Sequence, residues 1–182
     1  MEITSLSDDT SDLIRRAYDL CEEGEYVLAL QYYDLALEKN PRDISVLIDK
    51  GVTLQNMDKY LEALECYDRA LTVDSNNVDV LVNKGSVLHT LGRYDDAITC
   101  YNLALKIDAK HPMTLAYKGL SLGELGRLEE ALKCFNQALK VDKKYDVALI
   151  NREVTLQLLK ENKLDSTSSR HTSNDTIDKP RN

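Results

Sequence analysis

The chain has 182 residues, of which 43% are apolar, and its formal net charge at pH 7 is −8. An acidic protein with a pI near 4.9 gains nothing from nonspecific attraction to nucleic acid or to anionic membranes, so we expect neither as a partner. No stretch approaches the roughly 18 to 20 consecutive apolar residues of a spanning helix. The acidic N-terminus does not resemble a secretory signal. We therefore expect a soluble, cytoplasmic protein.

A pattern of small, aromatic and aliphatic residues recurs along the chain with a period of 34 residues and no insertion. The residues that show it most clearly are Gly51, Gly85 and Gly119, then Ala63, Ala97 and Ala131, then Cys66, Cys100 and Cys134. An internal repeat of this length is typical of stacked units, each of which packs mainly on its neighbours. We therefore expect contacts that are local along the sequence.

The first repeat, residues 10–43, is predicted to form two helices joined by a tight turn. Leu13 and Ala17 line one helical face, Gly24 interrupts the pattern, and a second apolar face begins at Tyr26. The apolar residues recur at the spacing of an α-helix on both sides of the glycine. One repeat is thus predicted to be one helical hairpin.

Three further repeats follow at residues 44–77, 78–111 and 112–145. Each has an apolar stripe with a period of 3.6 residues, then a turn, then a second stripe. The fourth repeat opens with Pro112, which suits the first turn of a helix because its missing N–H would have no partner there.

Glycines inside the predicted first helices need a packing reason. A glycine within a helix costs about 1 kcal/mol relative to alanine, so close approach of two helices is the compensation we expect. We therefore predict that Gly51, Gly85 and Gly119 face the alanine rows of the second helices.

The two ends of the chain differ from the repeats. Residues 146–162 repeat the first-helix pattern, but Glu153 replaces the glycine and no second helix follows, which predicts a capping helix with a polar outer face. Residues 163–182 are rich in Ser, Thr, Asp and Asn and are predicted to be a disordered tail. Residues 1–9 are predicted to be a flexible N-terminus.

The residues with reactive side chains do not form a catalytic or metal-binding pattern. Cys66, Cys100 and Cys134 fall one per repeat, about 10 Å apart if helix pairs stack, which is too far for a disulfide. No C-x-x-C pair suggests zinc. The three histidines are dispersed, and adjacent carboxylates on a helix point in different directions. We therefore expect no enzyme activity, no metal and no cofactor.

A small residue, then Ala, then Tyr or Phe, then Ala recur every 34 residues. This pattern resembles the tetratricopeptide repeat family. The resemblance covers residues 10–145 and the capping helix. The sequence motif NKG…LGRYDDAI resembles prokaryotic, particularly archaeal, members of the family. Departures are Leu where the family often has Trp, and lysines before the glycines where it often has Leu. The resemblance implies an all-α fold, a right-handed superhelical solenoid of antiparallel helix-turn-helix repeats.

The resemblance also implies that the first helices line a concave groove that holds a peptide or a partner helix. The predicted groove residues are Ile48, Asp49, Val52, Val82, Asn83, Ser86, Tyr117, Leu120 and Asn151. An Asn amide both donates and accepts hydrogen bonds and can hold a peptide backbone. The alternative is that Asn is simply a common residue of the repeat consensus on a solvated helix face and binds no peptide. Aligned Ile and Val side chains exposed over several units would form a patch that calls for a cover.

One subgroup of the family clamps the acidic C-terminus of heat-shock chaperones with Lys, Asn and Arg side chains. In this chain the matching places hold Ile14, Tyr18, Asp49, Asp79 and Asn83. A register shifted by one repeat gives Ile48, Val52, Asn83, Met113 and Tyr117. Neither set contains a cation, so binding of that type is disfavoured.

The sequence thus predicts a noncatalytic protein-interaction scaffold or adaptor. Two alternatives stay open at this point. The chain can be a self-assembling structural unit, a homo-oligomer, or it can be the substrate-binding partner of a separate enzyme such as a glycosyltransferase or peptidase.

Overall fold

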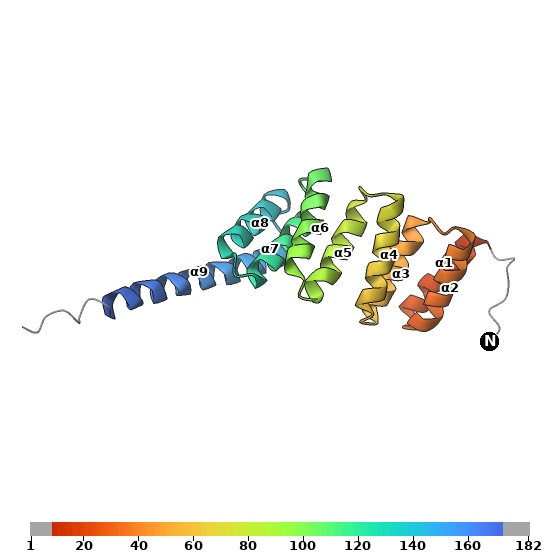
Figure 1. Cartoon of the computed structure of the whole chain (residues 1–182), viewed down its shortest axis with the longest axis horizontal. Coiled ribbons are helices and arrows are strands. Elements are labelled where there is room, and N and C mark those ends of the chain that lie inside the picture. The colour runs from red at the N-terminus through yellow and green to blue at the C-terminus, as the bar shows by residue number, and fades with distance from the viewer. Residues whose placement is uncertain (1–8, 173–182) are drawn as a thin grey trace, which may run out of the picture. The chain divides into compact units, whose positions relative to one another are not determined.

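The computed structural model describes residues 9–172, with side chains for residues 9–162, and every regular element in that range is an α-helix (Figure 1). These residues fall into two compact units, one ending at Ala109 and the other beginning at Lys110. Each unit is built from antiparallel helix pairs, as the sequence predicts.

The first unit contains three helical hairpins. Its helices are α1 (Thr10–Glu22), α2 (Tyr26–Lys39), α3 (Ile44–Asn56), α4 (Tyr60–Val73), α5 (Val78–Thr90) and α6 (Tyr94–Ile107). Each odd-numbered helix packs mainly on the helix that follows it, and α2–α3 and α4–α5 contacts join successive hairpins. Figure 1 shows the three hairpins in order, from red to green.

The second unit contains one hairpin and a long final helix. Its helices are α7 (Pro112–Glu124), α8 (Leu128–Val141) and α9 (Asp146–Thr172). Helix α9 packs on α8 and, less extensively, on α7. Below, α1, α3, α5, α7 and α9 are called the first helices, and α2, α4, α6 and α8 the second helices.

Helix α9 is longer than the sequence predicts. The capping helix was expected to end at Asn162, but α9 continues to Thr172 and projects past α7 and α8 (Figure 1). The sequence from Asp146 to Thr172 contains neither glycine nor proline, so nothing in it forces the helix to stop at the predicted position. The predicted flexible segments at residues 1–8 and 173–182 lie outside the described residues.

The turns inside the hairpins require a left-handed backbone. Gly24, Gly92 and Gly126 have φ of 80°, 73° and 71°, and Asp58 occupies the same place in the second repeat with φ of 58°. Glycine reaches this region without the steric cost that a Cβ imposes. The turn residues therefore fix where each first helix ends.

In each of the first three repeats, the residue at the last position caps the next first helix. The side chains of Asp43, Asn77 and His111 accept hydrogen bonds from the backbone N–H groups of Val46, Val80 and Thr114. Each bond satisfies one of the N–H groups that a helix start leaves without a partner. The starts of α3, α5 and α7 are thus specified locally.

The glycines of the first helices allow close packing, but their partner differs from the predicted one. A Cβ added at Gly51, Gly85 or Gly119 would lie 2.6, 2.5 or 2.6 Å from the ring of Tyr67, Tyr101 or Phe135, respectively. The predicted partners, the alanine methyl groups, are not the nearest atoms. The aromatic ring is the bulkiest side chain of the hairpin interior, so it fills the space that a glycine leaves free.

The four cysteines are all free thiols. Cys66, Cys100 and Cys134 are buried, and burial raises the pKa of each thiol above its ordinary value. A buried thiol with a raised pKa behaves as a small apolar side chain.

Candidate functional site

The first helices of the first unit carry six of the predicted groove residues. Val52 is 38% exposed, and Ile48, Asp49, Asn83 and Ser86 are half-buried. Val82 is only 3% exposed, so its side chain contributes to packing and offers little surface to a ligand. Sequence reasoning placed Val82 on the same helical face as its neighbours, but burial depends on the helices packed around it.

Asp49 lies beside an aromatic residue from the neighbouring first helix. The Tyr18 hydroxyl on α1 donates a hydrogen bond of 2.5 Å to Asp49 Oδ2 on α3. Tyr18 also makes an edge-to-face contact with Tyr33, with ring centroids 6.4 Å apart. The hydrogen bond to Asp49 is the main cause that raises the pKa of Tyr18 to about 12, while burial raises the pKa of Asp49.

These residues line a small depression, which we call the tyrosine hollow. It has a volume of about 140 Å³ and is lined by Tyr18, Cys21, Tyr26, Tyr33, Asp49, Val52, Thr53 and Asn56. The predicted site contained Asp49 and Val52 but missed Tyr18, Tyr26 and Asn56. A signal for Tyr18 was present in the sequence, because the same place in later repeats holds Val52, Ser86 and Leu120, none of which is aromatic.

The second unit carries the other three predicted groove residues. Tyr117 and Leu120 on α7 and Asn151 on α9 are all half-buried. Asn151 Nδ2 donates a 2.7 Å hydrogen bond to the carbonyl oxygen of Val147 in its own helix. One of the two amide N–H groups of Asn151 is thus used within α9, and the carbonyl oxygen and the second N–H are the groups that a ligand could use.

A second depression, the glycine hollow, lies among α7, α8 and α9. It has a volume of about 150 Å³ and is lined by Gly119, Leu120, Gly123, Glu124, Leu128, Phe135, Asn151, Val154, Thr155 and Leu158. A Cβ at Gly123 would meet nothing within 4 Å. Earlier first helices have Cys21, Gln55 and His89 at this place, so a glycine here leaves space that those side chains would occupy.

The glycine hollow is more apolar than its counterparts in earlier repeats. In the second repeat the Tyr67 hydroxyl donates a hydrogen bond to Gln55, whereas the fourth repeat has Phe135 and Gly123 at these two places. Val154 and Leu158 on α9 add exposed aliphatic surface. The predicted site missed Gly123, Val154 and Leu158; the signal was a helical glycine outside the 34-residue glycine series.

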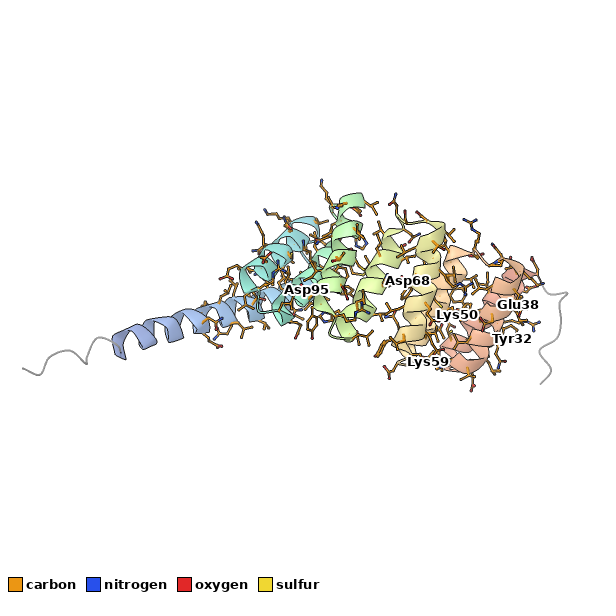
Figure 2. All side chains as sticks on the ribbon, in the orientation of Figure 1. Tyr32, Glu38, Lys50, Lys59, Asp68 and Asp95 are labelled. Atoms are coloured by element: carbon orange, nitrogen blue, oxygen red, sulfur yellow. The ribbon has the colours of Figure 1, made fainter. Side chains whose placement is uncertain are left out.

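Two ion pairs that sequence reasoning missed link successive hairpins of the first unit. Lys50 on α3 pairs with Asp34 on α2, and Lys84 on α5 pairs with Asp68 on α4; Lys50 and Asp68 are labelled in Figure 2. In both pairs the lysine follows the aspartate by 16 residues. This repeated spacing is the feature of the sequence from which the ion pairs could have been predicted. Lys50 and Lys84, which precede Gly51 and Gly85, therefore serve contacts between hairpins.

A larger depression beside the second ion pair does not offer a free charge. It has a volume of about 310 Å³ and is lined by Leu64, Asp68, Lys84, Leu88, Arg93, Asp96, Thr99, Cys100 and Leu103. Lys84 pairs with Asp68, and Arg93 pairs with Asp96. Its cations and carboxylates neutralise each other, so it is a weaker candidate than the two hollows on the first helices.

Within residues 9–162, where side chains are described, no three His, Cys, Asp or Glu residues are grouped so that they could hold a metal ion. None of the helices in the described part of the chain combines the length and apolar character needed to cross a membrane.

Comparison with known proteins places these hairpins in a family. Sequence profiles of the tetratricopeptide repeat family match residues 44–77 and residues 76–144. The chain belongs to the tetratricopeptide repeat (TPR) family. The predicted membership and the predicted all-α class of TPR solenoids are thereby confirmed. No match was found among curated proteins.

Several solved TPR structures are similar to this chain. A TPR protein from Parabacteroides merdae is 27% identical, with a TM-score of 0.75 over 84% of this chain and 60% of its own length. YrrB, a TPR protein with an unusual peptide-binding site, is 26% identical, with a TM-score of 0.67 over 84% of this chain and 78% of its own. The first TPR domain of Spaghetti (RPAP3), bound to the HSP90 peptide SRMEEVD, is 26% identical, with a TM-score of 0.62 over 64% of this chain and 92% of its own.

Proposed function

We propose that this TPR protein is a noncatalytic scaffold that binds a segment of a partner protein on the faces of its first helices. The bound segment is an extended peptide or a helix, and each unit has a hollow that can take one of its side chains. The residues proposed to contact it are Ile48, Asp49, Val52, Asn83, Ser86, Tyr117, Leu120 and Asn151, with Val82 supporting them from the interior.

The observation that carries this proposal is the size and position of the hollows. Each unit has one on its first helices, with volumes of about 140 and 150 Å³. Pockets for drug-sized molecules usually span roughly 300 to 1,000 Å³, so these hollows suit single side chains. Both are bordered by exposed aliphatic residues, Val52 in one and Val154 and Leu158 in the other. A bound segment would cover that apolar surface.

Two similar structures lend support by what they bind. YrrB has an unusual peptide-binding site, and Spaghetti holds the peptide SRMEEVD. Peptide recognition is therefore a use of this fold in proteins about a quarter identical to this chain. What the peptide contains must be argued from this chain's own residues.

The proposal is tested with a peptide display library screened against the full chain, followed by fluorescence anisotropy of the selected peptides. Val52→Lys and Leu120→Asp should each weaken binding, because each variant places a charged group among apolar contacts. Leu103→Lys on α6 and Val141→Asp on α8 introduce the same groups at exposed positions of the second helices and should leave binding unchanged. Circular dichroism of every variant checks that the helices are retained.

Gly123→Leu gives a sharper test in the second unit. The added side chain should fill the glycine hollow, since the space around Gly123 is empty, and it should exclude the side chain of a peptide without unfolding α7. Equal affinity in Val52→Lys, Leu120→Asp, Gly123→Leu and the two controls would contradict the proposal. A library that selects no related sequences would contradict it as well.

Self-assembly is a second candidate because the second helices also expose apolar residues. Val27 and Leu28 on α2 and Leu61 on α4 are 62%, 38% and 69% exposed. Large aliphatic side chains that share a surface often mark a contact with another protein. Sedimentation velocity of the chain and of Leu61→Asp decides this: a concentration-dependent dimer that the variant abolishes supports assembly, and a monomer at all concentrations rejects it.

A further inference from the structure

We infer that the tyrosine hollow binds a basic side chain of the partner, a lysine ammonium or an arginine guanidinium, between its tyrosine rings and the carboxylate of Asp49. This inference rests on the proposed function, because it states which kind of residue a bound peptide places on the first unit. It goes further by giving the peptide a charge and a register.

The carboxylate of Asp49 has no cation beside it in the described part of the chain. Its one side-chain hydrogen bond comes from the neutral hydroxyl of Tyr18. The lysine next to it in sequence, Lys50, pairs with Asp34, and Arg15 on α1 pairs with Asp12. A half-buried carboxylate without a counter-charge is costly to keep ionised, so a cation from a ligand would be bound favourably.

The effects of neighbouring groups on the pKa of Asp49 are consistent with a missing counter-charge. Burial raises its pKa, the Tyr18 hydrogen bond partly opposes that effect, and the like charge of Asp43 raises the pKa further. A cationic ligand would reverse the two unfavourable effects. It would bring the missing positive charge and would replace lost hydration with direct contact.

The rest of the hollow suits the other features of a basic side chain. Tyr18 and Tyr26 contribute aromatic surface, and Val52 contributes aliphatic surface, while Tyr33 is only 1% exposed and supports the hollow from the core. The face of an aromatic ring attracts a cation, and the methylene stem of lysine or arginine packs on apolar groups while its charged head stays polar. The exposed side chain of Asn56 supplies a further oxygen atom at the same place.

Among the first helices of the described residues, only the pair α1 and α3 combines an aromatic ring and an acid at these two places. One repeat later, Val52 and Asn83 stand where Tyr18 and Asp49 stand, and neither carries a charge or a ring. A basic residue would therefore find one preferred place on the first unit, and the register of the bound peptide would follow from it. The acidic peptide SRMEEVD held by Spaghetti has the opposite charge and would be repelled here.

The test is an NMR titration of the full ¹⁵N-labelled chain with capped pentapeptides Gly-Gly-X-Gly-Gly, where X is lysine, arginine, norleucine or glutamate. The lysine or arginine peptide should shift the amide signals of Tyr18, Asp49 and Val52 in a saturable manner, and the norleucine peptide should bind at least about tenfold more weakly. The two basic peptides together show whether ammonium or guanidinium is preferred. Added salt should weaken the binding of both.

Two matched variants separate the carboxylate from general charge. Asp49→Asn keeps the shape of the side chain and should weaken the basic peptides about tenfold, whereas Glu65→Gln, at an exposed position of α4, removes the same charge elsewhere and should change nothing. Tyr18→Leu should also weaken binding, because it removes the ring. Equal binding of lysine and norleucine peptides, or full binding by Asp49→Asn, would overturn the inference.

The outcomes also separate this inference from the proposed function. If library peptides bind through Val52 and Leu120 but show no preference for a basic residue, the inference fails and the scaffold function stands. If the basic pentapeptides bind at Asp49 but the library selects nothing, the cation site stands and the scaffold function fails. If neither binds, both fail.

Discussion

Replacing Gly119 and Gly123 by alanine, one at a time, should change the stability of the protein in opposite directions. Both glycines lie inside α7, one helical turn apart, so both substitutions remove the same helix penalty of about 0.5 to 1 kcal/mol. At Gly123 a Cβ would meet nothing within 4 Å. Gly123→Ala is therefore expected to raise the free energy of unfolding by that whole amount.

Gly119→Ala meets the ring of Phe135 instead. The new Cβ would lie 2.6 Å from Phe135 Cε1, and Phe135 is only 1% exposed, so the ring cannot move aside without displacing other core atoms. Overpacking of a well-packed core costs about 1 to 3 kcal/mol. Subtracting the helix gain leaves a net loss of roughly 1 kcal/mol.

The difference between the two variants isolates the steric cost, about 1 to 3 kcal/mol. Urea unfolding followed by circular dichroism measures it, provided the dependence on urea is the same for both variants and the parent. The double variant Gly119→Ala, Phe135→Leu should recover part of the loss because it removes ring atoms. If Gly119→Ala stabilises the chain as much as Gly123→Ala does, the close contact does not limit packing and the reasoning is refuted.

Three further predictions concern titratable and paired groups. Cys21, which is half-buried, should react with a thiol reagent in the native state at least about tenfold faster than the three buried cysteines. The raised pKa of the buried thiols leaves less of the reactive thiolate. Equal reaction rates for all four cysteines would show that burial does not protect them. Asp49→Asn should stabilise the chain at pH 7, because the pKa of the Asp49 carboxyl in the folded state lies above its ordinary value of 3.8. Ionisation of this carboxyl therefore lowers the free energy of unfolding above the raised pKa and has no effect below pH 3.8. Urea unfolding at pH 7 and near pH 3.8 should show that the advantage of the variant shrinks in acid. Lys84→Leu should change the free energy of unfolding by less than about 1 kcal/mol, since the ion pair of Lys84 with Asp68 is partly exposed. A loss of several kcal/mol in thermal or urea unfolding would show that the ion pair stabilises the fold more than its exposure suggests.

Most of the hairpin architecture could be predicted from the sequence because the period has no insertions. The first helices begin at Thr10, Ile44, Val78, Pro112 and Asp146, which are the first residues of the predicted repeats and of the capping helix. Local signals suffice here, since a capping side chain precedes three of these helices and a residue with positive φ lies in each of the four hairpin turns.

What the sequence did not predict depends on contacts between helices. The ring opposite each glycine, the Asp–Lys pairs and the burial of Val82 all involve residues on different helices, and a helical pattern read one helix at a time cannot show them. The same holds for the site. Tyr18 and Asp49 meet only because α1 and α3 lie side by side, and Gly123 opens a hollow only because α8 and α9 border it. The role of the predicted groove residues in binding remains a prediction.

The Asp–Lys pairs between hairpins have a consequence for how such a chain can lengthen. The second repeat, residues 44–77, offers Lys50 to the hairpin before it and Asp68 to the hairpin after it. A tandem duplication of these residues would present a new lysine to Asp68 and a new aspartate to Lys84, so every junction would keep its pair. Gene duplication can therefore add one such block while keeping the Asp–Lys pair at both of its junctions.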